Sequence, residues 1–276
     1  FGPICDPLTR DPVTGACGSV FPNNQIPAGR IDPVASSFLE HVPLPSGPGE
    51  VQNLTAIEPL EAVADQFTVR LDHRFGPRDQ LFARFSSFDA NDVQPFGTSV
   101  QQEVLIPGFG RTLSTKTRNL AFSYTHTLGT AMLNETRFGW MNVGGGQTSL
   151  NQGTDFASTV GLAGVTSDPR DVGFPQIDTG GFYSPMGDPT SFIFRRNEHF
   201  ELYNNFLMDQ GAHRMKFGGY WFHLKLRPEN PDTARGRFVY TGQFSGNPFG
   251  DFLLGYPVQA RSGTGGRGDE DARTNW

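Results

Sequence analysis

Polar and apolar residues alternate without exception along Gln66-Phe67-Thr68-Val69-Arg70-Leu71-Asp72. Successive side chains of a β-strand point to opposite faces, so this stretch predicts a strand with one apolar and one polar face. The residues Gly76-Pro77-Arg78-Asp79 are typical of a tight turn. The chain then returns through Leu81-Phe82-Ala83-Arg84-Phe85-Ser86. We therefore predict a β-hairpin over about residues 64–90.

The same arrangement recurs twice. Residues 119–125 alternate, and after a turn near Leu128-Gly129-Thr130 the chain returns through residues 134–140. Residues 197–209 and 215–226 surround a turn near Gly211–His213. We predict hairpins at about 114–143 and 193–226, and further strands within 236–276. Proline is absent from 110–168 and from 190–227, as expected of sheet segments, because proline removes a ladder hydrogen bond.

The connections fall into two length classes. The three hairpin turns are short, whereas the joins at 91–113 and 144–192 are long and rich in Gly, Pro, Asp, Ser and Thr. Short turns at one end and long loops at the other are typical of a bacterial outer-membrane barrel. We predict that the short turns lie at the periplasmic end and that the long loops are extracellular.

The two faces of the first strand suit such a barrel. Gln66, Thr68, Arg70, Asp72 and Arg74 are expected to line a hydrated lumen. The residues expected to face lipid are Phe67, Val69, Leu71 and Phe75. Tyr124, Trp140 and Trp221 are expected to form an aromatic girdle at the membrane interface. The fold class predicted is all-β, an antiparallel transmembrane β-barrel segment of about six to eight strands from a larger barrel.

Composition agrees with this class. Gly and Pro account for 34 and 21 of the 276 residues, which leaves little room for long helices. No apolar run approaches the roughly 18–20 residues of a membrane helix. Lys and Arg number 22 against 28 Asp and Glu, for a net charge of −6. This acidic balance argues against a nucleic-acid partner, which would require clustered positive charge.

Residues 1–60 differ in composition and pattern from residues 61–276, which we predict to be the partial barrel. They predict an irregular Pro/Gly-rich extracellular segment with one short helix at 32–41. Asp32 would cap this helix and Pro33 would be its first residue. Cys5 and Cys17 lie twelve residues apart in this segment. Their proximity predicts a disulfide formed in an oxidising compartment, with two free thiols as the alternative.

Four groups of residues resemble the TonB-dependent outer-membrane receptors, and most closely the Oar-like subgroup that carries a carboxypeptidase-regulatory-like domain. In chain order they are Phe21–Pro27 with Arg30–Ala35 and Pro43–Pro45, then Asp65–His73 with Asp79–Phe85, then His213–Gly219, then Gly250–Pro257. The resemblance covers most of the chain.

The resemblance implies energy-coupled uptake through a barrel of roughly 22 strands that holds a plug domain. It also implies a short amino-terminal box that binds TonB. Neither part is recognisable here, and the chain starts at Phe1 and not at Met, so we expect a piece of a longer protein. The partners expected are outer-membrane lipid, an unidentified ligand, and the TonB complex through parts outside this chain.

No catalytic, cofactor-binding or metal-binding residue is predicted. G-x-S-x-G, H-E-x-x-H and C-x-x-C are all absent. His199 and Glu201 share one face of a strand and could bind a metal, but two lumen-facing polar residues explain them as well. We therefore expect no enzyme and no cofactor. Two alternatives remain open: a structural or adhesive outer-membrane barrel, and a soluble secreted β-sandwich that binds carbohydrate around a Phe-rich core.

Overall fold

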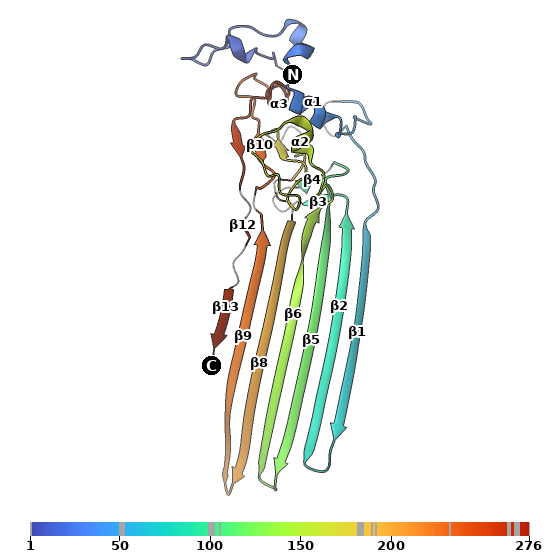
Figure 1. Cartoon of the computed structure of the whole chain (residues 1–276), viewed down its shortest axis with the longest axis vertical. Coiled ribbons are helices and arrows are strands. Elements are labelled where there is room, and N and C mark those ends of the chain that lie inside the picture. The colour runs from blue at the N-terminus through green and yellow to red at the C-terminus, as the bar shows by residue number, and fades with distance from the viewer. Residues whose placement is uncertain are drawn as a thin grey trace.

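The computed structural model describes residues 2–49, 53–98, 103–104, 106–180, 185–188, 190, 192–231, 233–263, 266–267 and 271–275. Its main feature is one antiparallel sheet of six long strands that neighbour one another in chain order (Figure 1). The strands are β1 (Glu61–Arg74), β2 (Asp79–Gln94), β5 (Arg111–Leu128), β6 (Met132–Ser149), β8 (Phe192–Gln210) and β9 (His213–Asn230). The all-β antiparallel class predicted from the sequence is confirmed.

Two short strands extend this sheet. Both β12 (Gly266–Arg267) and β13 (Asp271–Asn275) pair antiparallel with β9. At the opposite edge, β1 pairs with β2 alone among the strands that the structure describes. The sheet is therefore open, with β1 forming one of its edges.

Connections of different length lie at opposite ends of the sheet. The short turns occupy residues 75–78, 129–131 and 211–212, and all three lie at the lower end in Figure 1. Gly129 and Gly211 have φ values of 68° and 60°, a left-handed conformation that glycine adopts without steric strain. The long connections leave from the other end. The predicted separation of short turns from long loops is confirmed.

The long connections fold together into a structure that we call the cap. It contains three short helices, α1 (Pro33–Leu39), α2 (Phe156–Val160) and α3 (Pro248–Leu254), and a small sheet in the order β11-β10-β7. The strands of the small sheet are β7 (Gln176–Asp178), β10 (Arg237–Val239) and β11 (Gln259–Arg261). A two-residue hairpin, β3 (Gly97–Thr98) with β4 (Glu103–Val104), lies in the connection between β2 and β5. No helix in the described part of the chain is long and apolar enough to cross a membrane.

Residues 236–276 contain further strands, as predicted, but only β12 and β13 join the long sheet. Strands β10 and β11 belong to the small sheet of the cap, and α3 lies between them. Local signals explain the helix. The Asn247 side chain accepts a hydrogen bond from the amide of Gly250, Pro248 occupies the first turn, and Gly255 ends the helix in a left-handed conformation.

The segment before β1 also differs from the expectation of a separate irregular unit. Its helix α1 begins at Pro33 as predicted, with the Asp32 carboxylate accepting from the amides of Val34 and Ala35. Three single-turn 3-10 helices precede it, Pro7–Thr9, Pro22–Asn24 and Ala28–Arg30. Phe38 of α1 is fully buried. Its ring packs against rings from distant segments, those of Phe109, Phe156, Phe174 and Phe252. Burial of these rings joins the segment to the cap.

Candidate functional site

Strand register assigns each long-sheet side chain to one of two faces. Directly opposite residues of an antiparallel pair lie on the same side of the sheet. One such row runs through Val69, Phe85, Leu120, Trp140 and Phe200, from β1 to β8. We call the face that carries this row the outer face, and the opposite one the inner face.

The outer face carries one charged residue, Asp79, over a defined length beyond the short turns. Asp79 begins β2 opposite His126 and accepts a hydrogen bond from the Tyr124 hydroxyl. Above it, going up each strand, the first Asp, Glu, Lys or Arg on this face is Asp65 on β1, Asp89 on β2, Arg118 on β5, Glu198 on β8 and Lys225 on β9. The uncharged interval runs from Leu120 to Leu128 on β5, which is nine residues, and from 213 to 223 on β9, which is eleven. A strand needs about 9–11 residues to cross the hydrocarbon core of a bilayer.

Apolar side chains fill most of this interval, which we call the outer apolar band. Its members are Phe67, Val69, Leu71, Leu81, Ala83, Phe85, Leu120, Phe122, Tyr124, Leu128, Met132, Phe138, Trp140, Phe200, Leu202, Phe206, Met208, Met215, Phe217 and Trp221. The five long strands that carry charge beyond it continue toward the cap, so the sheet is taller than the bilayer is thick.

Over the same length the inner face is charged. Arg70 forms an ion pair with Asp72, with Nε 2.6 Å from Oδ2, and lies 4.7 Å from the centre of the Phe82 ring. Asp209 and Arg214, directly opposite each other on β8 and β9, are joined at 2.7 Å. A hollow of about 790 Å³ lies on this face. Its polar lining side chains are Arg70, Gln80, Ser123, Thr125, Glu135, Arg137, Glu201, Tyr203 and Asn205.

The division of the first strand into two faces is confirmed, and the assignment of one to lipid and the other to a lumen stays a prediction. Phe67, Val69 and Leu71 lie on the outer face with 55–61% of their surface exposed. The inner face carries the predicted lumen residues, which are Gln66, Thr68, Arg70, Asp72 and Arg74. Phe75 lies just beyond the end of β1 and is also exposed. A soluble β-sandwich would bury its apolar face against a second sheet, and in the described part of the chain no sheet covers this one, so the sandwich alternative is not supported.

The three predicted girdle aromatics all lie on the outer face, at three heights. Tyr124 is near the short turns, where its hydroxyl donates to the carboxylate of Asp79. Trp140 is at the upper limit of the outer apolar band and donates from Nε1 to the Oε1 atom of Glu198 at 3.1 Å. Trp221 stacks on His223. Trp140 therefore marks the upper border of the band, while Tyr124, midway between Leu120 and Leu128, and Trp221 lie within it.

The cap holds a buried charge network. Arg235 is 1% exposed and donates to the carbonyls of Asp171 and Val172 and to the side chain of Asn151. Burial lowers the pKa of Arg235 to about 10 and raises the pKa of Asp188. Asp188 accepts hydrogen bonds from the Ser149 hydroxyl and the Thr190 amide. These contacts connect the ends of the long strands to the connecting segments.

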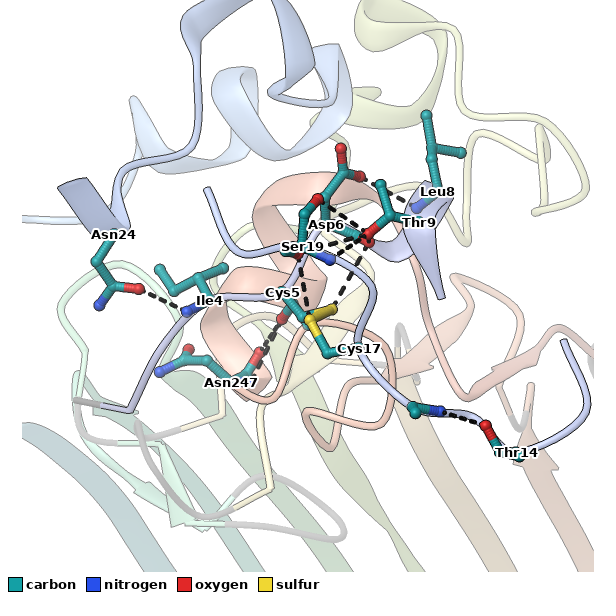
Figure 2. The surroundings of a disulfide bond; sticks show 12 residues. Ile4, Cys5, Asp6, Leu8, Thr9, Thr14, Cys17, Ser19, Asn24 and Asn247 are labelled. Carbon is teal, nitrogen blue, oxygen red and sulfur yellow. Dashed lines mark hydrogen bonds between the residues drawn. A yellow bond between two sulfur atoms is a disulfide. The ribbon is translucent and has the colours of Figure 1, made fainter. Parts of the chain in front are cut away.

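Cys5 and Cys17 are joined by a disulfide bond in the structure (Figure 2). Beside it, the Ser19 amide donates to the Thr9 hydroxyl at 2.9 Å. The amide of Cys5 donates to the Ser245 carbonyl, just before α3. The disulfide therefore closes a loop that is attached to the cap. Nearby, the guanidinium of Arg30 lowers the pKa of Asp6 by hydrogen bonding to its carboxylate.

His199 and Glu201 lie on the inner face, as the alternation predicts. The His199 ring contacts Phe222 edge-on, and Glu201 accepts a hydrogen bond from the Tyr203 hydroxyl. Among the described residues, no three His, Cys, Asp or Glu side chains are grouped so that they could hold a metal ion.

Sequence reasoning did not identify the charged positions that limit the outer apolar band. The signal was present, because the period-two pattern continues past Phe67 to Asp65 and past Leu120 to Arg118. The buried pair of Arg235 and Asp188 had no comparable signal, since its members come from loops without periodicity.

Comparison with known proteins gives one match. A family model described as an outer membrane beta barrel domain matches residues 1–276. No curated protein matches, and no solved structure matches.

Proposed function

Because this chain belongs to the family of outer membrane beta barrel domains and lies in the outer membrane, we propose that it forms part of the wall of a TonB-dependent receptor for energy-coupled ligand uptake. The observation that carries the membrane placement is the contrast between two faces of the same strands. Over one bilayer thickness the outer face carries a single charged residue, Asp79 near the short turns, while the inner face carries Arg70, Asp72, Glu135, Arg137 and Glu201. A lipid-facing surface and a hydrated lumen require that contrast.

The open edge at β1 supports a barrel wall with more strands than this sheet contains. Every unpaired backbone N–H or C=O group in hydrocarbon costs several kcal/mol, so open sheet edges are not tolerated there. Further strands must therefore pair with β1 in the membrane. A wide barrel of about 22 strands encloses a lumen large enough for a plug, as the proposed receptor requires.

The cap supports a role at the cell surface. Long connections lie at the extracellular end of outer-membrane barrels, which supports an extracellular position for the cap. Loops positioned by a rigid scaffold are where binding residues are concentrated. The disulfide and the Phe38 core hold the cap in one shape, which suits presentation of a binding surface.

The resemblance to TonB-dependent receptors also falls on structurally important parts. The group Asp65–His73 with Asp79–Phe85 forms the paired strands β1 and β2, and His213–Gly219 begins β9 at its turn. The group Gly250–Pro257 forms most of α3 and its left-handed end, in the core of the cap. The resemblance and the fold therefore agree over both halves of the molecule.

The test is an association measurement. Full-length protein, purified from outer membranes in detergent, is titrated with the purified periplasmic part of TonB. We expect saturable binding that is lost when the amino-terminal box upstream of this chain is deleted. Absence of binding by full-length protein with an intact barrel would overturn the receptor proposal and favour the structural or adhesive alternative.

A further inference from the structure

A basic cluster lies on the outer face directly above the outer apolar band. It consists of Lys116 and Arg118 on β5, Arg196 on β8, and Lys225 and Arg227 on β9. The chain as a whole is acidic, at −6, and has only three lysines, of which two belong to this cluster. Two carboxylates lie at the same height, Asp89 directly opposite Lys116 and paired with Arg118, and Glu198 directly opposite Lys225. Five basic and two acidic side chains therefore leave a net positive charge at this height of the outer face.

Two members of the cluster have no side-chain partner among the described residues. Arg118 is paired with Asp89, with NH2 2.6 Å from Oδ2. In contrast, Lys116 and Arg196 are exposed and form neither an ion pair nor a hydrogen bond through their side chains within the described part of the chain. An exposed cation without a partner is available to an external anion.

Gly144 separates these two cations. Register places Lys116 opposite Gly144 and Gly144 opposite Arg196, so the three share one row across β5, β6 and β8. Two strand spacings put the outer positions roughly 10 Å apart. A Cβ atom at Gly144 would have its nearest neighbour only at 3.9 Å, so the space above this glycine is open. The two long side chains can therefore converge on one group that sits over Gly144.

A neighbouring pair adds to the case for an anion. Arg196 and Arg227 are directly opposite each other on β8 and β9. Like charges in directly opposed positions destabilise a sheet, and an anion between them relieves the repulsion. Arg binds phosphate oxygens through paired N–H groups, and Lys binds them as a compact charge.

The height of the cluster indicates what carries the anion. It begins where the uncharged interval of about nine to eleven residues ends, at the border between hydrocarbon and headgroups on the cap side. Basic residues at that level attract anionic lipid headgroups. We propose that Lys116 and Arg196, with Gly144 between them, bind the phosphate group of an outer-leaflet lipid. The proposal depends on the membrane position of the band and not on transport.

The experiment uses full-length protein in neutral detergent, titrated with lipid A, a phosphorylated glucosamine lipid, and followed by native mass spectrometry. The test variant is Lys116→Gln with Arg196→Gln. The matched control is Lys216→Gln with Arg195→Gln, which removes one lysine and one arginine from the inner face, on β9 and β8. Arg195 and Arg196 are adjacent in sequence and differ in the face they occupy, so the control separates position from net charge.

We expect the test variant to bind lipid A roughly 30-fold more weakly than wild type, on the order expected for two lost basic contacts to an anionic lipid. The control variant should bind like wild type, and lipid A stripped of its phosphates should bind all three proteins equally weakly. Equal weakening in both variants, or tight binding of the stripped lipid, would overturn the proposal. Displacement of lipid A by excess inorganic phosphate would also overturn it, because the site would then recognise free phosphate. The association with TonB tests the receptor proposal separately, and neither variant is expected to change it.

Discussion

Trp140 on β6 donates its indole N–H to the Glu198 carboxylate on β8 across 3.1 Å, at the height where the outer face changes from apolar to charged. The indole ring is level with Leu120 and Phe200, while Glu198 belongs to the charged positions above. Tryptophan is suited to this border because its ring is apolar and its N–H needs a polar partner. The contact locates the upper limit of the membrane-embedded part of the sheet.

Opposite faces of β1 should respond oppositely to a new charge. Val69→Arg puts a guanidinium into lipid and is expected to lower the free energy of unfolding by roughly 2–4 kcal/mol. Thr68→Arg puts it into the hydrated lumen and removes only the hydrogen bond from Thr68 to Ser86, so its effect should be below about 1 kcal/mol. Reversible unfolding of the full-length protein in lipid measures both. Equal losses at the two positions would contradict the assigned faces.

The cap should depend on one buried ring. Phe38→Ala removes a fully buried side chain that packs against four other phenylalanine rings and is expected to destabilise the cap by roughly 3–5 kcal/mol. Leu44→Ala, at a position that is 86% exposed, is the control and should be neutral. Hydrogen exchange should show faster opening of α1 and α3 in the Phe38 variant alone. Unchanged protection there would contradict the proposed core.

Stability of the cap should also vary with pH through Asp188. Burial raises the pKa of this carboxyl, so the folded cap holds the proton more tightly than the unfolded chain does. Its contribution is therefore fully present below the ordinary pKa of Asp, near 3.8, and is lost as the pH rises through the raised value. Asp188→Asn should remove this part of the pH dependence. Thermal unfolding of both proteins between acidic and neutral pH measures it, and parallel curves would contradict the prediction.

Reduction of the disulfide should loosen only the outer part of the cap. The bond closes a loop between residues separated by twelve positions, for which chain entropy gives about 3 kcal/mol. Cys5→Ser with Cys17→Ser should therefore make residues 2–30 sensitive to protease while the long strands stay protected. Cleavage that is equal with and without the bond would show that the hydrogen bonds around Ser19 and Ser245 are sufficient.

The sequence predicts the parts of this fold that depend on a local period. Alternation at Phe67, Val69 and Leu71 is enough to assign two faces, because a residue's parity along a strand determines its side. The observed strands β5 and β6 extend beyond the predicted hairpin at about 114–143, because alternation is lost near their ends. Near Gly144 and Thr115 polar and small residues occupy both faces, so the alternation disappears although pairing continues.

The cap could not be predicted in this way. The rings around Phe38 come from segments as distant as Phe109 and Phe252, and no period links them. Helix α3 is an intermediate case. Its capping residues, Asn247 and Gly255, are local signals present in the sequence, whereas the prediction over 236–276 is of further strands and no helix.

The membrane placement of the sheet requires that the outer-face residues of the long strands meet lipid. A spin-label scan along β1 measures this directly. Labels are placed one at a time at positions 65 to 74 of the full-length protein in lipid bilayers, and their accessibility to oxygen and to a water-soluble nickel complex is recorded. We predict that oxygen accessibility peaks at 67, 69 and 71, that nickel accessibility peaks at 66, 68, 70 and 72, and that oxygen accessibility falls at 65. A scan without a period of two, or one with the opposite phase, would contradict the membrane placement of this sheet.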